Sequence, residues 1–158
     1  MNKCIGKGTI GEYTVTEETT MKQIDTAQLD ITACQAQAAE YHARGFNCAQ
    51  AVACTLAPAV GLDPQTAFIL TEGFGAGMGG MMQTCGAVAA MFMALGLANS
   101  SGDLQACDTK TQTMKKVREL AAEFEKKNGS IVCRELKGID TGKVLRSCDG
   151  CIEDGIRI

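Results

Sequence analysis

Large aromatic side chains and histidines are scarce in this chain. It contains no Trp, aromatic residues make up 4% of its 158 residues, and His42 is its single histidine. One histidine argues against a Ser-His-Asp catalytic set and against the His pairs that many zinc modules use. We therefore expect His42 to be structural, and we expect the core to be built from Ala, Leu, Ile, Val and Met.

A basic surface and a long apolar run are also missing. The net charge is −3, whereas nucleic-acid binding needs a basic face. The longest apolar stretch, residues 87–98, is too short to span a bilayer, and residues 1–20 hold no apolar segment of the signal-peptide type. We expect a cytoplasmic protein that binds neither nucleic acid nor membrane.

Cysteine, in contrast, is abundant. The chain has nine, an odd number that cannot pair completely into disulfides. In a reducing cytosol, clustered cysteines indicate metal binding or redox chemistry. The alternative is a set of inert thiols buried as small apolar side chains.

The spacing of apolar residues predicts an all-α single domain of about five helices over residues 26–158. Residues 1–25, with β-prone side chains between glycines, are predicted to form an extended or hairpin arm. A short helical turn is predicted at residues 133–136. The residues predicted to cap the main helices are Asp25, Asn47, Asp63, Thr84 and Thr109, with Gln28 and Gln112 completing capping boxes at the first and the last of them.

Three cysteines share a predicted position at a helix start. Cys48, Cys85 and Cys148 each follow directly after an Asn, Thr or Ser residue, which are good helix caps. The free backbone N–H groups and the positive dipole end at a helix start favour an anion, so we expect these thiols to have a lowered pKa. Cys133 is predicted to lie near the start of a short helix, at the third position after Ser130.

Cys148 and Cys151 form a CxxC motif, which suits metal chelation and dithiol–disulfide exchange. Ile152 stands where haem attachment would need His. No second CxxC is present, which argues against a zinc ribbon but not against an iron–sulfur site. The other cysteines lack such a setting: Cys34 and Cys54 are expected in the core, and Cys4 and Cys107 are expected to be incidental.

A glycine-rich segment occupies residues 73–80. No strand is predicted before it, so it does not match a dinucleotide fingerprint, and no Gly-Lys-Ser/Thr follows it as in a P-loop. We expect it to bring backbone close to a bulky group, such as a cluster or another helix. The glycines expected to line a cofactor are Gly75, Gly77, Gly79 and Gly86.

Several of these segments together resemble the C_GCAxxG_C_C family of redox-active proteins. The likeness covers roughly residue 35 to the end and rests on GFNCAQAV at 45–52, GFGAGMGG at 73–80, TCGAV at 84–88, LGL at 95–97 and IVCREL at 131–136. The family consists of helical bacterial and archaeal domains with spaced cysteines. Relatives are joined to haem-binding portions in the split-Soret cytochromes, where an iron–sulfur site is associated with the domain.

The resemblance implies that Cys48, Cys85, Cys133 and Cys148 are the family cysteines. Cys151 is an addition to the family pattern, as a fifth ligand or a resolving thiol, and Ala90 stands where the family usually has Gly. The implied function is electron transfer or redox sensing through a cysteine-ligated centre, with an iron–sulfur cluster as the first expectation and zinc as the alternative.

Other functions remain open at this point. One is a thiol–disulfide oxidoreductase that uses the same five cysteines, so whether the protein is an enzyme is undecided. Another is a structural zinc-binding or helical interaction module. The partner is expected to be a redox protein or a small electron carrier, and a homodimer is one assembly that we consider.

Overall fold

The computed structural model describes residues 29–106 and 108–158. Within these ranges the chain forms seven α-helices, and its only β-type pairing is one antiparallel bridge between Thr84 and Val132. The all-α prediction is confirmed, but five helices was too few. The two additional helices lie in the cysteine-rich C-terminal part: one occupies the predicted helical turn at residues 133–136, and the other begins at Cys148, where the sequence predicted a helix start. The predicted arm over residues 1–25 lies outside the described residues, as do Cys4 and Cys107.

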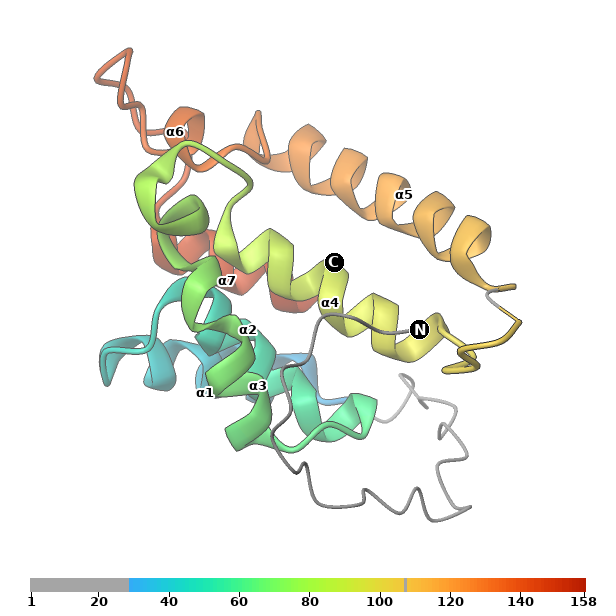
Figure 1. Cartoon of the computed structure of the whole chain (residues 1–158). Helices are drawn as coiled ribbons and strands as arrows, with labels where there is room; N and C mark the ends of the chain where they lie inside the picture. Colours follow the sequence, from blue (N-terminus) through green and yellow to red (C-terminus); the bar gives the residue numbers. More distant parts are fainter. Residues whose placement is uncertain (1–28, 107) are drawn as a thin grey trace, which may run out of the picture.

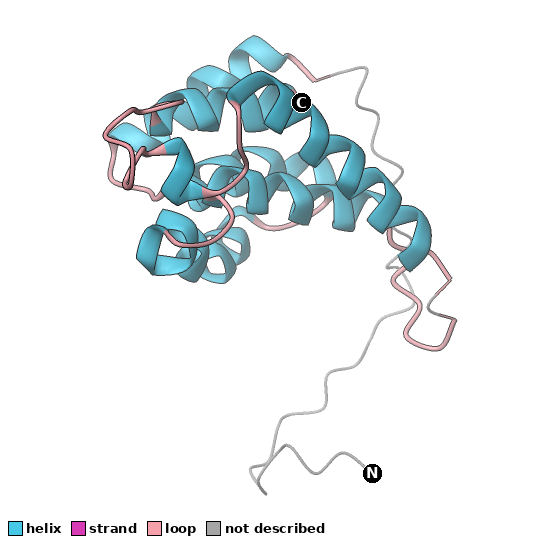
Figure 2. Cartoon of the chain, turned by 90° about the horizontal axis from the view of Figure 1, so that it is seen from above, coloured by secondary structure: helices cyan, strands magenta, loops and turns pink. Residues whose placement is uncertain are grey.

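Figure 2 shows the helices joined by turns and longer loops, drawn in pink. Their bounds are α1 Ile31–Ala43, α2 Cys48–Leu56, α3 Pro64–Thr71, α4 Gly86–Asn99, α5 Lys110–Asn128, α6 Cys133–Leu136 and α7 Cys148–Arg157. Between α3 and α4 the glycine-rich segment makes two short turns, η3 (Glu72–Phe74) and η4 (Gly77–Met81). No helix of the described ranges is both long and apolar enough to cross a membrane.

Helix α2 lies at the centre of the fold and packs against α1, α3, α4 and α7 (Figure 1). Its contact with α4 is built from small side chains that are fully buried, among them Ala49, Val52, Ala87 and Ala90. Small side chains let the two helices approach closely. Ala90, where the family usually has Gly, is accommodated within this core.

The predicted starts of α2, α3 and α7 are confirmed. Asn47 and Gln50 form a complete capping box at α2, and Asp63 caps α3 with Pro64 in its first turn. Ser147 caps α7 by accepting a hydrogen bond from the backbone N–H of Gly150 at 3.1 Å. Helix α2 ends at Leu56 and is followed by a 3-10 turn, η2 (Ala57–Val60), that contains Pro58.

Asp25 and Thr84 were wrong as caps, whereas Thr109 occupies the cap position of α5 but makes no capping bond with its side chain. Helix α1 is capped by Asp30, which accepts from the backbone N–H of Ala33 at 3.0 Å, while Asp25 and Gln28 lie outside the described residues. Thr84 is engaged in the β-bridge, which leaves Cys85 at the cap position of α4. Thr109 has helical backbone angles, and its hydroxyl accepts from the backbone N–H of Ser101 instead of capping α5.

Candidate functional site

All five cysteines singled out from the sequence line one cavity. The cavity has a volume of about 220 Å³, and its thiols belong to Cys48, Cys85, Cys133, Cys148 and Cys151. All five are free thiols, and four of them are buried, Cys148 being partly exposed. The remaining wall is formed by His42, Asn47, Ala76, Met81, Leu136 and Lys137. Residues far apart in the chain are thus brought together around one space.

Four separate helix starts position these thiols. Cys48, Cys133 and Cys148 are the first residues of α2, α6 and α7, and Cys85 directly precedes α4. The prediction that cysteines occupy helix starts is confirmed for Cys48 and Cys148. Cys133 opens its helix rather than occupying the third position, because Val132 adopts an extended conformation before it.

A pair of backbone hydrogen bonds brings Cys85 and Cys133 to the same place. The backbone N–H of Cys85 donates to the carbonyl of Ile131 at 2.8 Å, and that of Cys133 donates to the carbonyl of Gln83 at 2.9 Å. These bonds flank the Thr84–Val132 bridge. The bridge therefore joins the start of α4 to the start of α6 and places both thiols on the cavity wall.

Three of the thiols contact one another in a row. The Cys48 thiol is hydrogen-bonded to the Cys85 sulfur, and the Cys85 thiol is hydrogen-bonded to the Cys151 sulfur. Cys151 follows Cys148 by about one helical turn, which places both on the side of α7 that meets the cavity. The Cys148 sulfur accepts a hydrogen bond from the Lys137 ammonium.

The predicted lowering of the thiol pKa was wrong for Cys48 and Cys85. The hydrogen bond to Cys85, together with burial, holds the pKa of Cys48 well above its usual value. The hydrogen bond to Cys151 raises the pKa of Cys85 to about 12, with burial adding to it and the Cys48 hydrogen bond opposing it. Burial and the neighbouring thiols raise the pKa of Cys133. Mutual crowding and desolvation thus outweigh the helix-start effect.

Backbone from the glycine-rich segment reaches the thiols, as predicted. Hydrogen bonds from the backbone of Ala76 and Ala87 act on Cys48 and favour its thiolate, against the larger effects that raise its pKa. Ala76 adopts a left-handed backbone with φ of 48°, a costly conformation for a residue with a side chain. This strain accompanies the approach of the segment to the sulfur.

Two of the expected glycines have no room for a side chain beside the cysteines. A Cβ at Gly77 would lie 2.6 Å from Cys133 Cβ, and one at Gly86 would lie 2.7 Å from Cys48 Sγ. Gly75 is similarly close to Asn47, the cap of α2, whereas a Cβ at Gly79 would meet nothing within 4 Å. Gly77 and Gly86 therefore shape the cavity directly, and Gly75 supports the start of α2.

Two wall residues were not predicted from the sequence. His42, expected to be structural, lines the cavity, and its Nδ1 lies 2.6 Å from Asp149 Oδ1. Lys137 places a cation at the thiols. Burial lowers the pKa of Lys137, but the Cys148 hydrogen bond and the nearby thiols raise it more, so the net shift is upward. Lys137 and His42 belong to no recognisable sequence motif, so their positions at the cavity could be found only from the structure.

The remaining described cysteines lie away from the cavity. Cys54 is buried in α2, and its thiol donates to the carbonyl of Pro64 at 3.5 Å. Cys34 packs against the core in a partly buried position. Over residues 29–106 and 108–158, no three His, Cys, Asp or Glu side chains are clustered in the manner of a single-ion site.

The comparison with known families agrees with the cysteine arrangement. Residues 46–158 match the family described as "Putative redox-active protein (C_GCAxxG_C_C)", and the match takes in all five cavity cysteines. No match is found among curated proteins, and none among solved structures. The matched segment makes up well over half of the chain, and the chain therefore belongs to the C_GCAxxG_C_C family of redox-active proteins.

Proposed function

We propose that this protein transfers electrons, or senses redox state, through an iron–sulfur centre held by cavity thiols. The observation that carries the proposal is the convergence of five free thiols from four separate elements on one cavity. Cys48, Cys85, Cys133 and Cys148 are the proposed ligands, with Cys151 as the fifth thiol. The partner in the proposal is a redox protein or a small electron carrier.

The donor set supports a cluster. Iron–sulfur clusters are commonly held by four cysteine thiolates, and the cavity offers five thiols. The cavity volume of about 220 Å³ is also far larger than the roughly 10–15 Å³ that a single water-sized occupant needs. This size favours a polynuclear centre over the single zinc ion that we considered as the alternative.

The surroundings suit a redox centre. When bound, an iron–sulfur cluster supplies one-electron transfer, and its potential depends on hydrogen bonds to sulfur, local charge and solvent exposure. Here the backbone at Ala76 and Ala87 bonds to Cys48, and the ammonium of Lys137 donates a hydrogen bond to the sulfur of Cys148. Burial of Cys85 and Cys151 limits the access of water.

A second candidate function is supported by the row of contacting thiols. Cys48, Cys85 and Cys151 are close enough for hydrogen bonds between neighbours. In a thiol–disulfide oxidoreductase, two such thiols would lose two protons and two electrons to a disulfide substrate and form one S–S bond. The raised pKa of Cys85, to about 12, disfavours the thiolate that attacks a disulfide, whereas a bound metal centre would itself stabilise thiolate ligands, which argues for the metal centre first.

The test is anaerobic purification of the full chain, followed by a visible absorption spectrum and iron, sulfide and zinc analysis. A brown protein with iron and sulfide that are lost in Cys85→Ser supports the cluster. Cys54→Ser is the matched control, since this thiol is also buried but lies outside the cavity. A colourless, metal-free protein whose cavity thiols oxidise reversibly in pairs supports disulfide exchange, and stoichiometric zinc without iron overturns both.

A further inference from the structure

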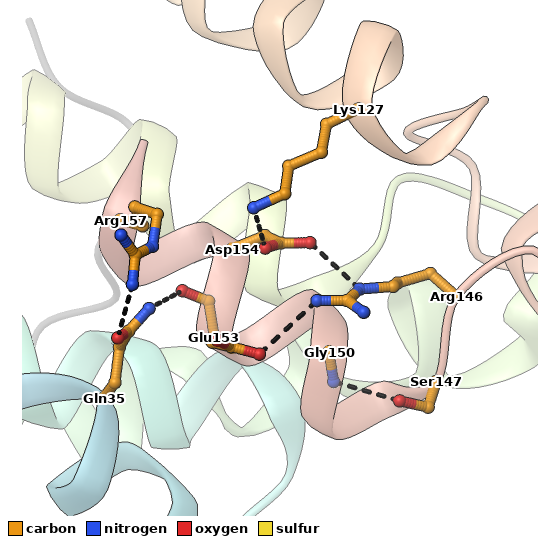
Figure 3. A network of polar contacts seen from close by, with 8 residues as sticks. All are labelled: Gln35, Lys127, Arg146, Ser147, Gly150, Glu153, Asp154 and Arg157. Carbon is orange, nitrogen blue, oxygen red and sulfur yellow. Dashed lines mark hydrogen bonds and ion pairs between the residues drawn. The ribbon is translucent and has the colours of Figure 1, made fainter. Parts of the chain in front are cut away.

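A buried carboxylate and its ion pairs lie on α7, the helix that also carries Cys148 and Cys151 (Figure 3). The Asp154 side chain on α7 has an exposed fraction of 0%. Lys127 Nζ, from the end of α5, lies 2.5 Å from Asp154 Oδ1, and Arg146 Nε donates to Oδ2 at 3.0 Å. Arg146 precedes α7, and its Nη2 also reaches Glu153 at 3.4 Å. One carboxylate thus joins the end of α5, the loop before α7 and α7 itself.

Burial makes this carboxylate dependent on its partners. A charged group removed from water is tolerated only when cations and hydrogen bonds replace its hydration. Such buried pairs add little net stability compared with apolar side chains of similar size, but they fix the geometry of the elements that carry them. The position of this network therefore matters more than its contribution to stability.

Arg146 crosses the turn of α7 that contains the CxxC motif. Arg146 lies against Gly150, the residue between the two cysteines of the motif, because a Cβ there would overlap its guanidinium. From Gly150 the arginine continues to Asp154, one turn further along α7. Ser147 holds the same turn by accepting from the Gly150 backbone N–H at 3.1 Å. The first turn of α7 is thus held between Arg146 and the cavity that Cys148 and Cys151 line.

We propose that Arg146 and Asp154 are positioning residues that fix the Cys148 and Cys151 thiols at the cavity, with Lys127 anchoring Asp154 to α5. The inference rests on the proposed function in that these thiols take part in the redox reaction. A Cβ at Gly150 would displace the guanidinium from its present path across the helix. Arg146 acts through the cysteines and touches no reacting atom itself.

The test compares Arg146→Met, Arg146→Lys and Gly150→Ala in the full, reduced, chelator-treated chain. Mass spectrometry follows the rate at which iodoacetamide modifies Cys148 and Cys151, with Cys54 as the internal reference. Gly96→Ala is the matched control for Gly150→Ala, because it also adds a Cβ inside a helix but meets nothing within 4 Å. Melting temperatures are recorded for all variants.

Arg146→Met and Gly150→Ala are expected to raise the two rates relative to Cys54 by about tenfold or more, through local opening of the first turn of α7. Arg146→Lys keeps the charge and gives a smaller increase, and Gly96→Ala gives none. The proposal is overturned if the modification rate of Cys54 rises equally, or if the rates of Cys148 and Cys151 stay unchanged. A merely structural role would lower the melting temperature without increasing the modification of these two thiols in particular.

Two further features of the design keep the result decisive. If Arg146→Met does not fold, Gly150→Ala decides, because replacing a helical glycine by alanine favours the helix by itself. The alkylation readout needs no metal. An absence of iron and sulfide in the unmodified protein would therefore count against the proposed function and leave the positioning result readable.

Discussion

Replacing Gly86 by alanine tests the closeness of α2 and α4 at the cavity. Gly86 is the first residue of α4, and a Cβ there would lie 2.7 Å from both Cys48 Sγ and the carbonyl oxygen of Phe74. A backbone oxygen cannot swing aside as a side chain can, so the start of α4 must shift away from Phe74 in η3 and from Cys48 in α2. Overpacking of this kind costs about 1–3 kcal/mol.

The opposing effect is the helix preference of alanine, which contributes roughly 0.5–1 kcal/mol. The difference is a loss of roughly 0–2.5 kcal/mol, and two contacts under 3.0 Å place Gly86→Ala in the upper half of that range. For a chain of this length each kcal/mol shifts the melting temperature by about 2–4 °C. We therefore expect a fall of roughly 2–10 °C in the reduced, metal-free protein.

The assay is thermal unfolding followed by circular dichroism, with Gly96→Ala as the control in the same helix. A Cβ at Gly96 meets nothing within 4 Å, so this variant is expected to keep or raise the melting temperature. Because Cys48 Sγ must move in Gly86→Ala, its iron content after anaerobic purification is expected to fall as well. A Gly86→Ala protein as stable and as iron-rich as Gly96→Ala would refute the reasoning.

Three further predictions concern the rest of the site and its support. Burial raises the pKa of Asp154, but its two cations lower it more, to a value below the usual 3.8. This carboxylate therefore contributes stability above pH 3.8 that is lost as the pH falls through its lower folded pKa. Asp154→Asn is expected to remove that dependence in acid unfolding and to cost about 3 kcal/mol at most, because both cations reach solvent. Gly77→Ala places a Cβ 2.6 Å from Cys133 Cβ in a left-handed backbone and is expected to lower the iron content. Gly79→Ala is the control, because it also places a side chain in a left-handed backbone but meets no neighbouring atom within 4 Å. Asn47→Ala removes the cap of α2 and a hydrogen bond to the carbonyl of Glu72, and urea unfolding is expected to show a loss of about 1–2 kcal/mol; a variant as stable as the unmodified protein would contradict the importance of the cap.

Local chemistry made the helix starts predictable from the sequence. A capping side chain bonds to backbone within three residues, so Asn47, Asp63 and Ser147 could be recognised without knowledge of the fold. The same reasoning failed at Thr84 and Thr109, where tertiary partners take the place of the cap. Thr84 pairs with Val132, which lies far along the chain, and no local pattern indicates that pairing.

The cavity could be predicted in part. The cysteines stood out through their helix-start positions, through CxxC and through the family resemblance, and the structure brings all five to one place. The residues around them could not be found in this way. Lys137 and His42 reach the cavity because the residue that follows α6 and the end of α1 meet the start of α7. Arg146 and Asp154 meet only across the first turn of that helix.

The thiol pKa values show why the sequence argument was incomplete. A helix start acts on each sulfur separately, and from that alone a thiolate is favoured. The fold places the sulfurs next to one another, so the negative charge that one sulfur would gain is opposed by the next, and burial withholds the water that would screen it. Hydrogen bonds to Cys85 and Cys151 accordingly raise the pKa values of Cys48 and Cys85, respectively. Helix starts thus determine where the thiols lie, whereas their proximity determines their charge, and a cationic metal centre is the kind of occupant that would relieve the opposition between them.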